Sequence, residues 1–174
     1  MATVLYILFY NANAVPRPLI HAVVRANSQN ALMKVSARNT FQGTISAIQP
    51  GTVNAEISLK TKRGDTLVAV VTAGSVKSLG LNVGKEVVAL VKAPWVMLAT
   101  GHGKRSFSAR NQWKGQVSTL VKGAVSAEVG VTLPGGTEVF AVVTKQAVKE
   151  MNLALGKEAV AIIKASDVIL AVAR

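Results

Sequence analysis

The sequence predicts an all-β protein: two tandem OB-like five-stranded β-barrels, each with one short helix, after a short N-terminal extension. Residues 36–99 return 72 positions later as 108–171 without a gap, and 28 of the 64 aligned residues are identical. Each repeat holds short valine-rich runs separated by turn residues, which is the pattern of strands in a small sheet. Closing a five-stranded sheet removes its exposed edges, so a barrel is the economical arrangement.

The repeat divides the chain into four segments. These are an N-terminal extension of low order (1–35), a first module (36–100), a linker (101–107) and a second module (108–174). Apolar residues within 19–34 favour a short helix there. Residues 4–10 form an apolar run that imitates a secretion signal, but the run is short and no cation precedes it, so we expect a cytoplasmic protein.

Three segments of the first repeat have the pattern of strands. Apolar and polar residues alternate from Val53 to Leu59, which predicts a half-buried strand. The continuous apolar runs 67–71 and 87–91 predict strands that are covered on both faces. Arg63-Gly64-Asp65 and, in the second repeat, Pro134-Gly135-Gly136 supply the turn between the second and third strands.

One short helix interrupts the strands of each repeat. Thr72 stands where an N-cap belongs, and Gly80 can end the helix. Thr144 is the counterpart of Thr72. At such a helix start, free backbone N–H groups and the positive end of the helix dipole point outward and favour tetrahedral anions. Ser75, three residues further on, can add a hydroxyl group.

Composition points to a binding protein rather than an enzyme. Lysine and arginine outnumber aspartate and glutamate by 20 to 8, which favours an anionic partner: nucleic acid, an acidic membrane or a small oxyanion. The chain has no cysteine, and its two histidines, His21 and His102, lie outside the repeats. Glu56 and Glu128 recur, but single acids on strand edges are typical of surface ion pairs and form no metal cage.

Several side chains that recur at the offset of 72 are suited to holding an oxyanion. The recurring set comprises Ser36, Arg38, Thr72 and Lys92 in the first repeat, and Ser108, Arg110, Thr144 and Lys164 in the second; Ser75 belongs to the candidate site of the first repeat only. The arginines offer planar forks of donors that stay charged, and the lysines end the fourth strand as compact cations. The serines at 36 and 108 precede the arginines by two positions, which places both on one face of an extended strand. The counterpart of Ser75 in the second repeat is Ala147, which has no hydroxyl.

These motifs resemble a known family. Ser36-Ala37-Arg38-Asn39, Val70-Val71-Thr72 followed by Ser75-Val76, and Val91-Lys92-Ala93 resemble the TOBE-like Mop module, and two copies resemble a di-Mop molbindin. The resemblance implies molybdate, with tungstate possible, bound at module interfaces by the set above. It also implies a homo-oligomer, with a trimer of two-module chains favoured over a dimer. We therefore expect intracellular storage or buffering of molybdate.

Two other functions stay open. The Mop pair also occurs in the molybdate-responsive transcription regulator, and Asn30-Ala31-Leu32-Met33-Lys34 resembles its lead-in, so the chain could be that regulator's effector-sensing part without the DNA-binding domain. The second alternative is an OB protein that binds single-stranded nucleic acid, because the chain is basic. Such proteins stack bases on aromatic side chains, and Phe41 and Trp113 are the recurring aromatic pair.

Overall fold

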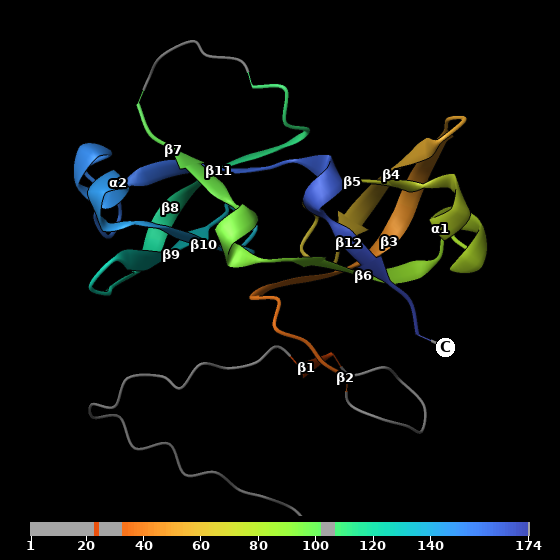
Figure 1. Cartoon of the computed structure of the whole chain (residues 1–174), viewed down its shortest axis with the longest axis horizontal. Coiled ribbons are helices and arrows are strands. Elements are labelled where there is room, and N and C mark those ends of the chain that lie inside the picture. Colours follow the sequence, from red (N-terminus) through yellow and green to blue (C-terminus); the bar gives the residue numbers. More distant parts are fainter. Residues whose placement is uncertain (1–22, 25–32, 102–106, 174) are drawn as a thin grey trace, which may run out of the picture.

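The computed structural model describes residues 23–24, 33–101 and 107–173. Two five-stranded sheets lie side by side along the long axis of the molecule (Figure 1). The first repeat contributes β3 (Asn39–Pro50), β4 (Asn54–Thr61), β5 (Thr66–Thr72), α1 (Ala73–Ser78), β6 (Glu86–Val91), the 3-10 turn η1 (Ala93–Trp95) and β7 (Met97–Ala99). The second contributes β8 (Asn111–Lys122), β9 (Ser126–Thr132), β10 (Glu138–Thr144), α2 (Lys145–Glu150), β11 (Glu158–Ile163), the 3-10 turn η2 (Ala165–Asp167) and β12 (Ile169–Ala171). The predicted all-β class, with five strands and one α-helix per repeat, is confirmed.

Each sheet is completed by the last strand of the other repeat. The strand orders are β12-β6-β3-β4-β5 and β10-β9-β8-β11-β7, so β7 and β12 change places. Val160 of β11 lies opposite Ala99 of β7, and Leu170 of β12 lies opposite Ala89 of β6. The edge strands β5 and β12 also contact each other, as do β10 and β7, so both sheets curl toward barrels. The sheets therefore do not follow the boundaries of the sequence repeat.

The predicted strands match the burial of their side chains. In β4, Ala55, Ile57 and Leu59 are buried while the residues between them are half-buried, which confirms the expected alternation. In β5, the consecutive residues 67–69 are all buried, because this strand is covered on both faces. The second covering layer comes from η2 of the other repeat, which packs against β5.

Residues with left-handed backbone conformations form the predicted turns. Gly64 and Gly136 have φ angles of 91° and 80° in the turns that follow β4 and β9. Gly80 ends α1 with φ 55°, as expected. Its counterpart after α2 is Asn152, which adopts φ 50° because asparagine tolerates the left-handed region better than most residues.

The helix predicted within 19–34 is wrong where the structure describes that segment. β1 (Val23–Val24) and β2 (Met33–Lys34) pair antiparallel, with Val23 opposite Lys34. Short apolar runs do not by themselves distinguish a helix from a strand, and here backbone pairing between two extended segments prevails. Residues 1–22 and 25–32 of the extension, with their expected low order, and residues 102–106 of the linker lie outside the described residues.

Two buried asparagines join the repeats. Asn39 Nδ2 donates to the carbonyl oxygen of Phe140 at 2.8 Å, and its Oδ1 accepts the N–H of Phe140 at 2.7 Å. Asn111 forms the equivalent pair with Val68 at 2.8 and 2.7 Å, and donates to the Ile163 carbonyl oxygen at 3.2 Å. Each amide thus occupies a hydrogen-bonding place on the edge strand of the other repeat.

The interface has pseudo-twofold symmetry. Phe41 and Trp113 hold equivalent positions, and their ring centroids lie 6.4 Å apart. Asp65 and Thr137 are also equivalent, and the threonine hydroxyl donates to the aspartate. Such self-complementary contacts are those of an isologous dimer, here formed within one chain. Buried apolar residues of both repeats form one continuous cluster, so the two modules share a core.

Asn111→Ala should lower the free energy of unfolding by at least about 2 kcal/mol. The buried N–H and carbonyl groups of Val68 would lose their partner, and each unsatisfied group costs about 1–3 kcal/mol. Asn54→Ala, at the exposed start of β4, is the control and should change the value by less than about 0.5 kcal/mol. Urea unfolding followed by tryptophan fluorescence measures both. Equal changes would contradict this role of the asparagine.

Candidate functional site

The candidate cations of each repeat lie together at one end of its sheet. β3 begins at Asn39 opposite Val91, the last residue of β6, so Arg38 and Lys92 flank the same end of the ladder. Lys92 follows β6 directly and is exposed, as predicted. We call this group, with the exposed Ser36, the cation group of the first repeat. The cation group of the second repeat consists of Ser108, Arg110 and Lys164, at the end of the β8–β11 ladder.

The expected strand geometry of Ser36 and Arg38 is wrong. Both precede β3, and Arg38 lies in a bend, so the two side chains do not share a face of a strand. Ser108 and Arg110 likewise precede β8. The reason is that β6 ends at Val91, so residues before Asn39 have no partner strand on that side.

The candidate hydroxyl groups lie at the helix starts. Thr72 Oγ1 accepts the N–H of Ser75 at 3.0 Å, which confirms the predicted N-cap, and its oxygen lies 2.8 Å from Ser75 Oγ. The Ala73 N–H donates to the Val53 carbonyl oxygen at 2.9 Å. Two first-turn N–H groups that were expected to be free are therefore occupied. The start of α1 therefore offers a ligand two adjacent hydroxyls, those of Thr72 and Ser75, which we call the hydroxyl group of the first repeat.

The hydroxyl group of the second repeat consists of Thr144 alone. Thr144 Oγ1 accepts the N–H of Ala147 at 3.1 Å, so the N-cap is the same. The methyl side chain of Ala147 supplies no second hydroxyl. The two repeats thus present the same cations but unequal sets of neutral donors.

The structure does not bring the cation and hydroxyl groups of one repeat together. Thr72 lies opposite Asn54 at the start of β4, next to the end of β3 at Pro50. Arg38 precedes the start of β3, which is the other end of the sheet. In Figure 1, α1 and α2 lie at opposite ends of the molecule, while η1, which follows Lys92, and η2, which follows Lys164, lie between them. Within the described ranges, no hydrogen bond or ion pair joins a cation group to a hydroxyl group.

The candidate arginines form ion pairs across the repeats. Arg38 donates from Nε and Nη2 to the two carboxylate oxygens of Glu128, at 3.2 and 3.1 Å. Arg110 donates from Nη2 to Glu56 at 2.8 Å. The predicted surface pairing of these glutamates is confirmed, but their partners are the candidate ligands themselves. The recurrence of both glutamates and both arginines at the offset of 72 is the sequence feature that indicates these ion pairs.

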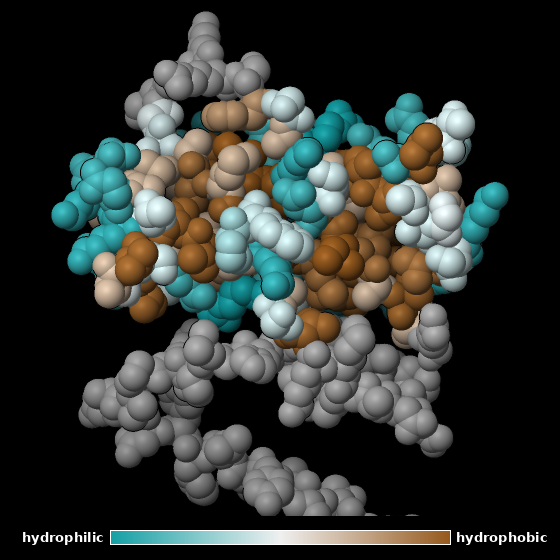
Figure 2. Space-filling view, in the orientation of Figure 1, coloured by the Kyte–Doolittle hydropathy of each residue, from teal (hydrophilic) through white to brown (hydrophobic). Residues whose placement is uncertain are grey.

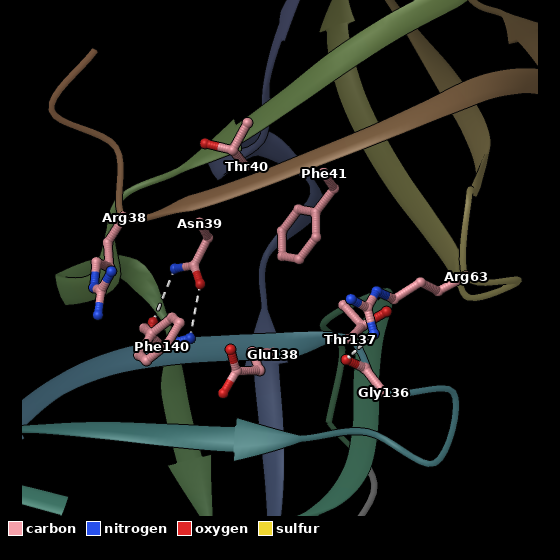
Figure 3. A pocket seen from close by; sticks show the side chains of 9 residues that line it. All are labelled: Arg38, Asn39, Thr40, Phe41, Arg63, Gly136, Thr137, Glu138 and Phe140. Atoms are coloured by element: carbon pink, nitrogen blue, oxygen red, sulfur yellow. Dashed lines mark hydrogen bonds between the residues drawn. The ribbon is translucent and has the colours of Figure 1, made fainter. Parts of the chain in front are cut away.

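A cavity of about 270 Å³ lies beside Arg38, between β3 and β10 (Figure 3). Its lining consists of Arg38, Asn39, Thr40, Phe41, Arg63, Gly136, Thr137, Glu138 and Phe140. Arg63 reaches across the interface and donates from Nη1 to the Gly136 carbonyl oxygen at 2.6 Å. Arg63 is not one of the recurring cations, because its counterpart is Gly135, and its guanidinium is occupied by the backbone of the other repeat. At the equivalent place, the larger ring of Trp113 donates to the Thr66 carbonyl oxygen at 3.1 Å.

Other site types find no support in the part of the chain that the structure describes. Its residues include no group of three or more His, Cys, Asp or Glu side chains able to hold a metal ion. None of its helices is long and apolar enough to cross a membrane. Of the recurring aromatic pair on which a single-stranded nucleic acid would stack its bases, Phe41 is only 8% exposed and Trp113 is half-buried.

Comparison with known families identifies the repeats. The model of the TOBE domain matches residues 35–98 and again 108–170. The chain belongs to the TOBE-domain family. This confirms the predicted tandem TOBE-like repeats and places Arg38, Lys92, Arg110 and Lys164 inside the two domains.

Relatives of this TOBE chain carry names connected with molybdenum. The molybdenum transport protein ModE of Herbaspirillum seropedicae is 41% identical over 140 residues, which cover 80% of this chain and 52% of ModE. The molybdenum-pterin-binding protein MopA of Rhodobacter capsulatus is 40% identical over 139 residues, with the same coverage. The chain therefore spans about half the length of these relatives.

A solved structure is also similar over most of the TOBE chain. It is that of the cytoplasmic molybdate-binding protein ModG with molybdate bound, which is 55% identical. The match has a TM-score of 0.78 and covers 81% of this chain and 100% of the ModG chain. The predicted similarity to two-module molbindins is confirmed.

Thr144→Ala should lower the free energy of unfolding by about 1 kcal/mol, because α2 loses its N-cap hydrogen bond. Thr144→Ser keeps the hydroxyl and should retain most of that stability. Chemical denaturation followed by circular dichroism measures both variants. Equal destabilisation by serine and alanine would show that the methyl group, not the hydroxyl, stabilises this turn.

Proposed function

We propose that this chain binds molybdate, with tungstate as an alternative ligand, and serves to store or buffer it in the cytoplasm. The observation that carries the proposal is the 55% identity to ModG, a cytoplasmic molybdate-binding protein, over the whole of the ModG chain. The curated relatives named for molybdenum transport or molybdenum-pterin binding point to the same ligand chemistry.

The recurring side chains suit a tetrahedral dianion. One arginine and one lysine match its two negative charges, and serine and threonine hydroxyls supply neutral donors. Hydrogen bonds to a charged group contribute about 1.5–3 kcal/mol each. A few such bonds, less the entropy lost on binding, are sufficient for micromolar affinity, which corresponds to about −8 kcal/mol.

Complete sites form between chains. The starts of α1 and α2 lie at opposite ends of the molecule, while η1 and η2, which follow Lys92 and Lys164, lie between them (Figure 1). A site containing both kinds of donor therefore needs a cation group from one chain and a hydroxyl group from another. A homo-oligomer, with a trimer favoured over a dimer, supplies such sites. Exposed apolar side chains that recur in both repeats support association: Val53 and Val125, Val83 and Leu155, Met97 and Ile169. Figure 2 shows hydrophobic surface on one face over both sheets.

A second candidate use of the same ligand is effector sensing within a transcription regulator. The similarity to ModE over half of that protein favours it. Both uses begin with molybdate binding, so one measurement tests their common basis.

Isothermal titration of molybdate into the purified chain should give saturable micromolar binding, and sulfate should give none. Arg38→Ala should weaken the sites that contain Arg38 by about 10- to 100-fold, the equivalent of one charge-assisted hydrogen bond. Arg63→Ala removes the same charge from the same interface and is the matched control. Light scattering after size exclusion measures the number of chains in the same sample.

The absence of heat at millimolar molybdate would overturn the proposed function. Binding that Arg38→Ala and Arg63→Ala weaken equally would show a diffuse electrostatic attraction instead of a site. In either case, a single-stranded oligonucleotide is the next ligand, because a steep loss of affinity with salt would then identify nucleic-acid binding.

Ala147→Ser should tighten the sites that use α2 by about three- to tenfold, because a neutral hydrogen bond contributes about 0.5–1.5 kcal/mol. Ser75→Ala should weaken the sites that use α1 by a similar factor. Ser78→Ala, which changes another serine of α1, is the control and should leave binding unchanged. Titration of all three variants checks the assignment, and unchanged affinity in Ser75→Ala and Ala147→Ser would remove these positions from the site.

A further inference from the structure

Arg38 is held on two sides. Its Nε and Nη2 atoms face the two carboxylate oxygens of Glu128, at 3.2 and 3.1 Å. Its guanidinium carbon lies 4.0 Å from the centre of the Phe140 ring, a cation–π contact. The backbone of Phe140 is in turn bound by Asn39, the next residue after the arginine, as Figure 3 shows. The arginine, its ring and its carboxylate therefore form one connected unit across the interface.

Arg110, the counterpart of Arg38, is held by fewer contacts. It makes one hydrogen bond to Glu56, from Nη2, and its side chain is 60% exposed, against 30% for Arg38. The counterpart of Phe140 is Val68, which has no aromatic face to support a guanidinium plane. The two glutamates themselves are similarly exposed, at 23% for Glu128 and 27% for Glu56. The difference therefore lies in the anchoring geometry.

We infer that Glu128 is a positioning residue for the oxyanion sites, acting through Arg38 with Phe140 as its support, whereas Glu56 has no comparable effect through Arg110. The inference rests on the proposed function. A guanidinium has five N–H donors, and the two that face Glu128 leave three for a ligand. Because the plane is already fixed, binding an anion there orders less side-chain motion than it does at Arg110.

Charge alone predicts the opposite effect. A carboxylate beside the site repels a dianion, so its removal should tighten binding. That contribution is shared by Glu128 and Glu56, since each is paired with a candidate arginine and the two are similarly exposed. A comparison of Glu128→Gln with Glu56→Gln therefore cancels the charge effect and leaves the effect of positioning.

The test is molybdate titration of the full chain in two backgrounds. Arg110→Ala leaves the Arg38 sites, and Glu128→Gln is added to it. Arg38→Ala leaves the Arg110 sites, and Glu56→Gln is added to that. We expect Glu128→Gln to weaken its sites by about three- to tenfold relative to the effect of Glu56→Gln, which is the affinity change for immobilising one long side chain. Thermal unfolding of the same variants separates a loss of affinity from a loss of stability. It should change little in Glu56→Gln, because the pair with the 60% exposed Arg110 contributes little stability, and more in Glu128→Gln, whose pair with Arg38 is partly buried.

A second variant tests the aromatic support independently. Phe140→Val, in the Arg110→Ala background, gives the first site the residue found at the second and should weaken binding by about two- to fivefold. Equal effects of the two glutamine substitutions, together with unchanged affinity in Phe140→Val, would overturn the inference while the proposed function stands. If the wild-type chain binds no molybdate, the proposed function fails, and this inference fails with it.

Discussion

The paired hydrogen bonds between each buried asparagine and the backbone of the other repeat are the contacts on which the rest of this structure depends. A module of about 65 residues buries too little surface to be robust alone. Asn39 and Asn111 join the modules, and the exchange of β7 and β12 completes each sheet with a strand of the other repeat. One continuous core results. The same contacts bring each candidate arginine to a carboxylate of the other repeat.

Duplication within one chain allowed two equivalent places to become different. In a symmetric dimer of identical modules, every change would appear on both sides of the axis. Here the ring of Phe140 lies against Arg38, whereas the counterpart of Phe140 is Val68 and the counterpart of Arg63 is Gly135. Ala147 removes a hydroxyl from one helix start and not from the other. The chain thus carries two versions of one donor set, which differ in rigidity and in neutral donors.

Sequence reasoning succeeded where the signal is local. The alternation in β4, the apolar run of β5, the glycine turns and the Thr72 N-cap each depend on a few consecutive residues and on backbone geometry. It failed for the segment around Val23, because so short an apolar run fits a strand as well as a helix. It also failed to predict that Arg38 precedes the strand β3 instead of lying in it. The start of β3 depends on where β6, some fifty residues away, ends.

The sequence by itself determined the repeat, the all-β class, the positive charge and the recurrence of arginine, lysine, serine and threonine at one offset. Those features are properties of residue identity and spacing. Only the tertiary structure decided that the last strands are exchanged, that Glu128 and Glu56 bind the arginines, and that cation and hydroxyl groups of one repeat lie apart. The physical reason is that a strand's hydrogen-bonding edge accepts a partner from either repeat equally well, so packing between the modules makes the choice.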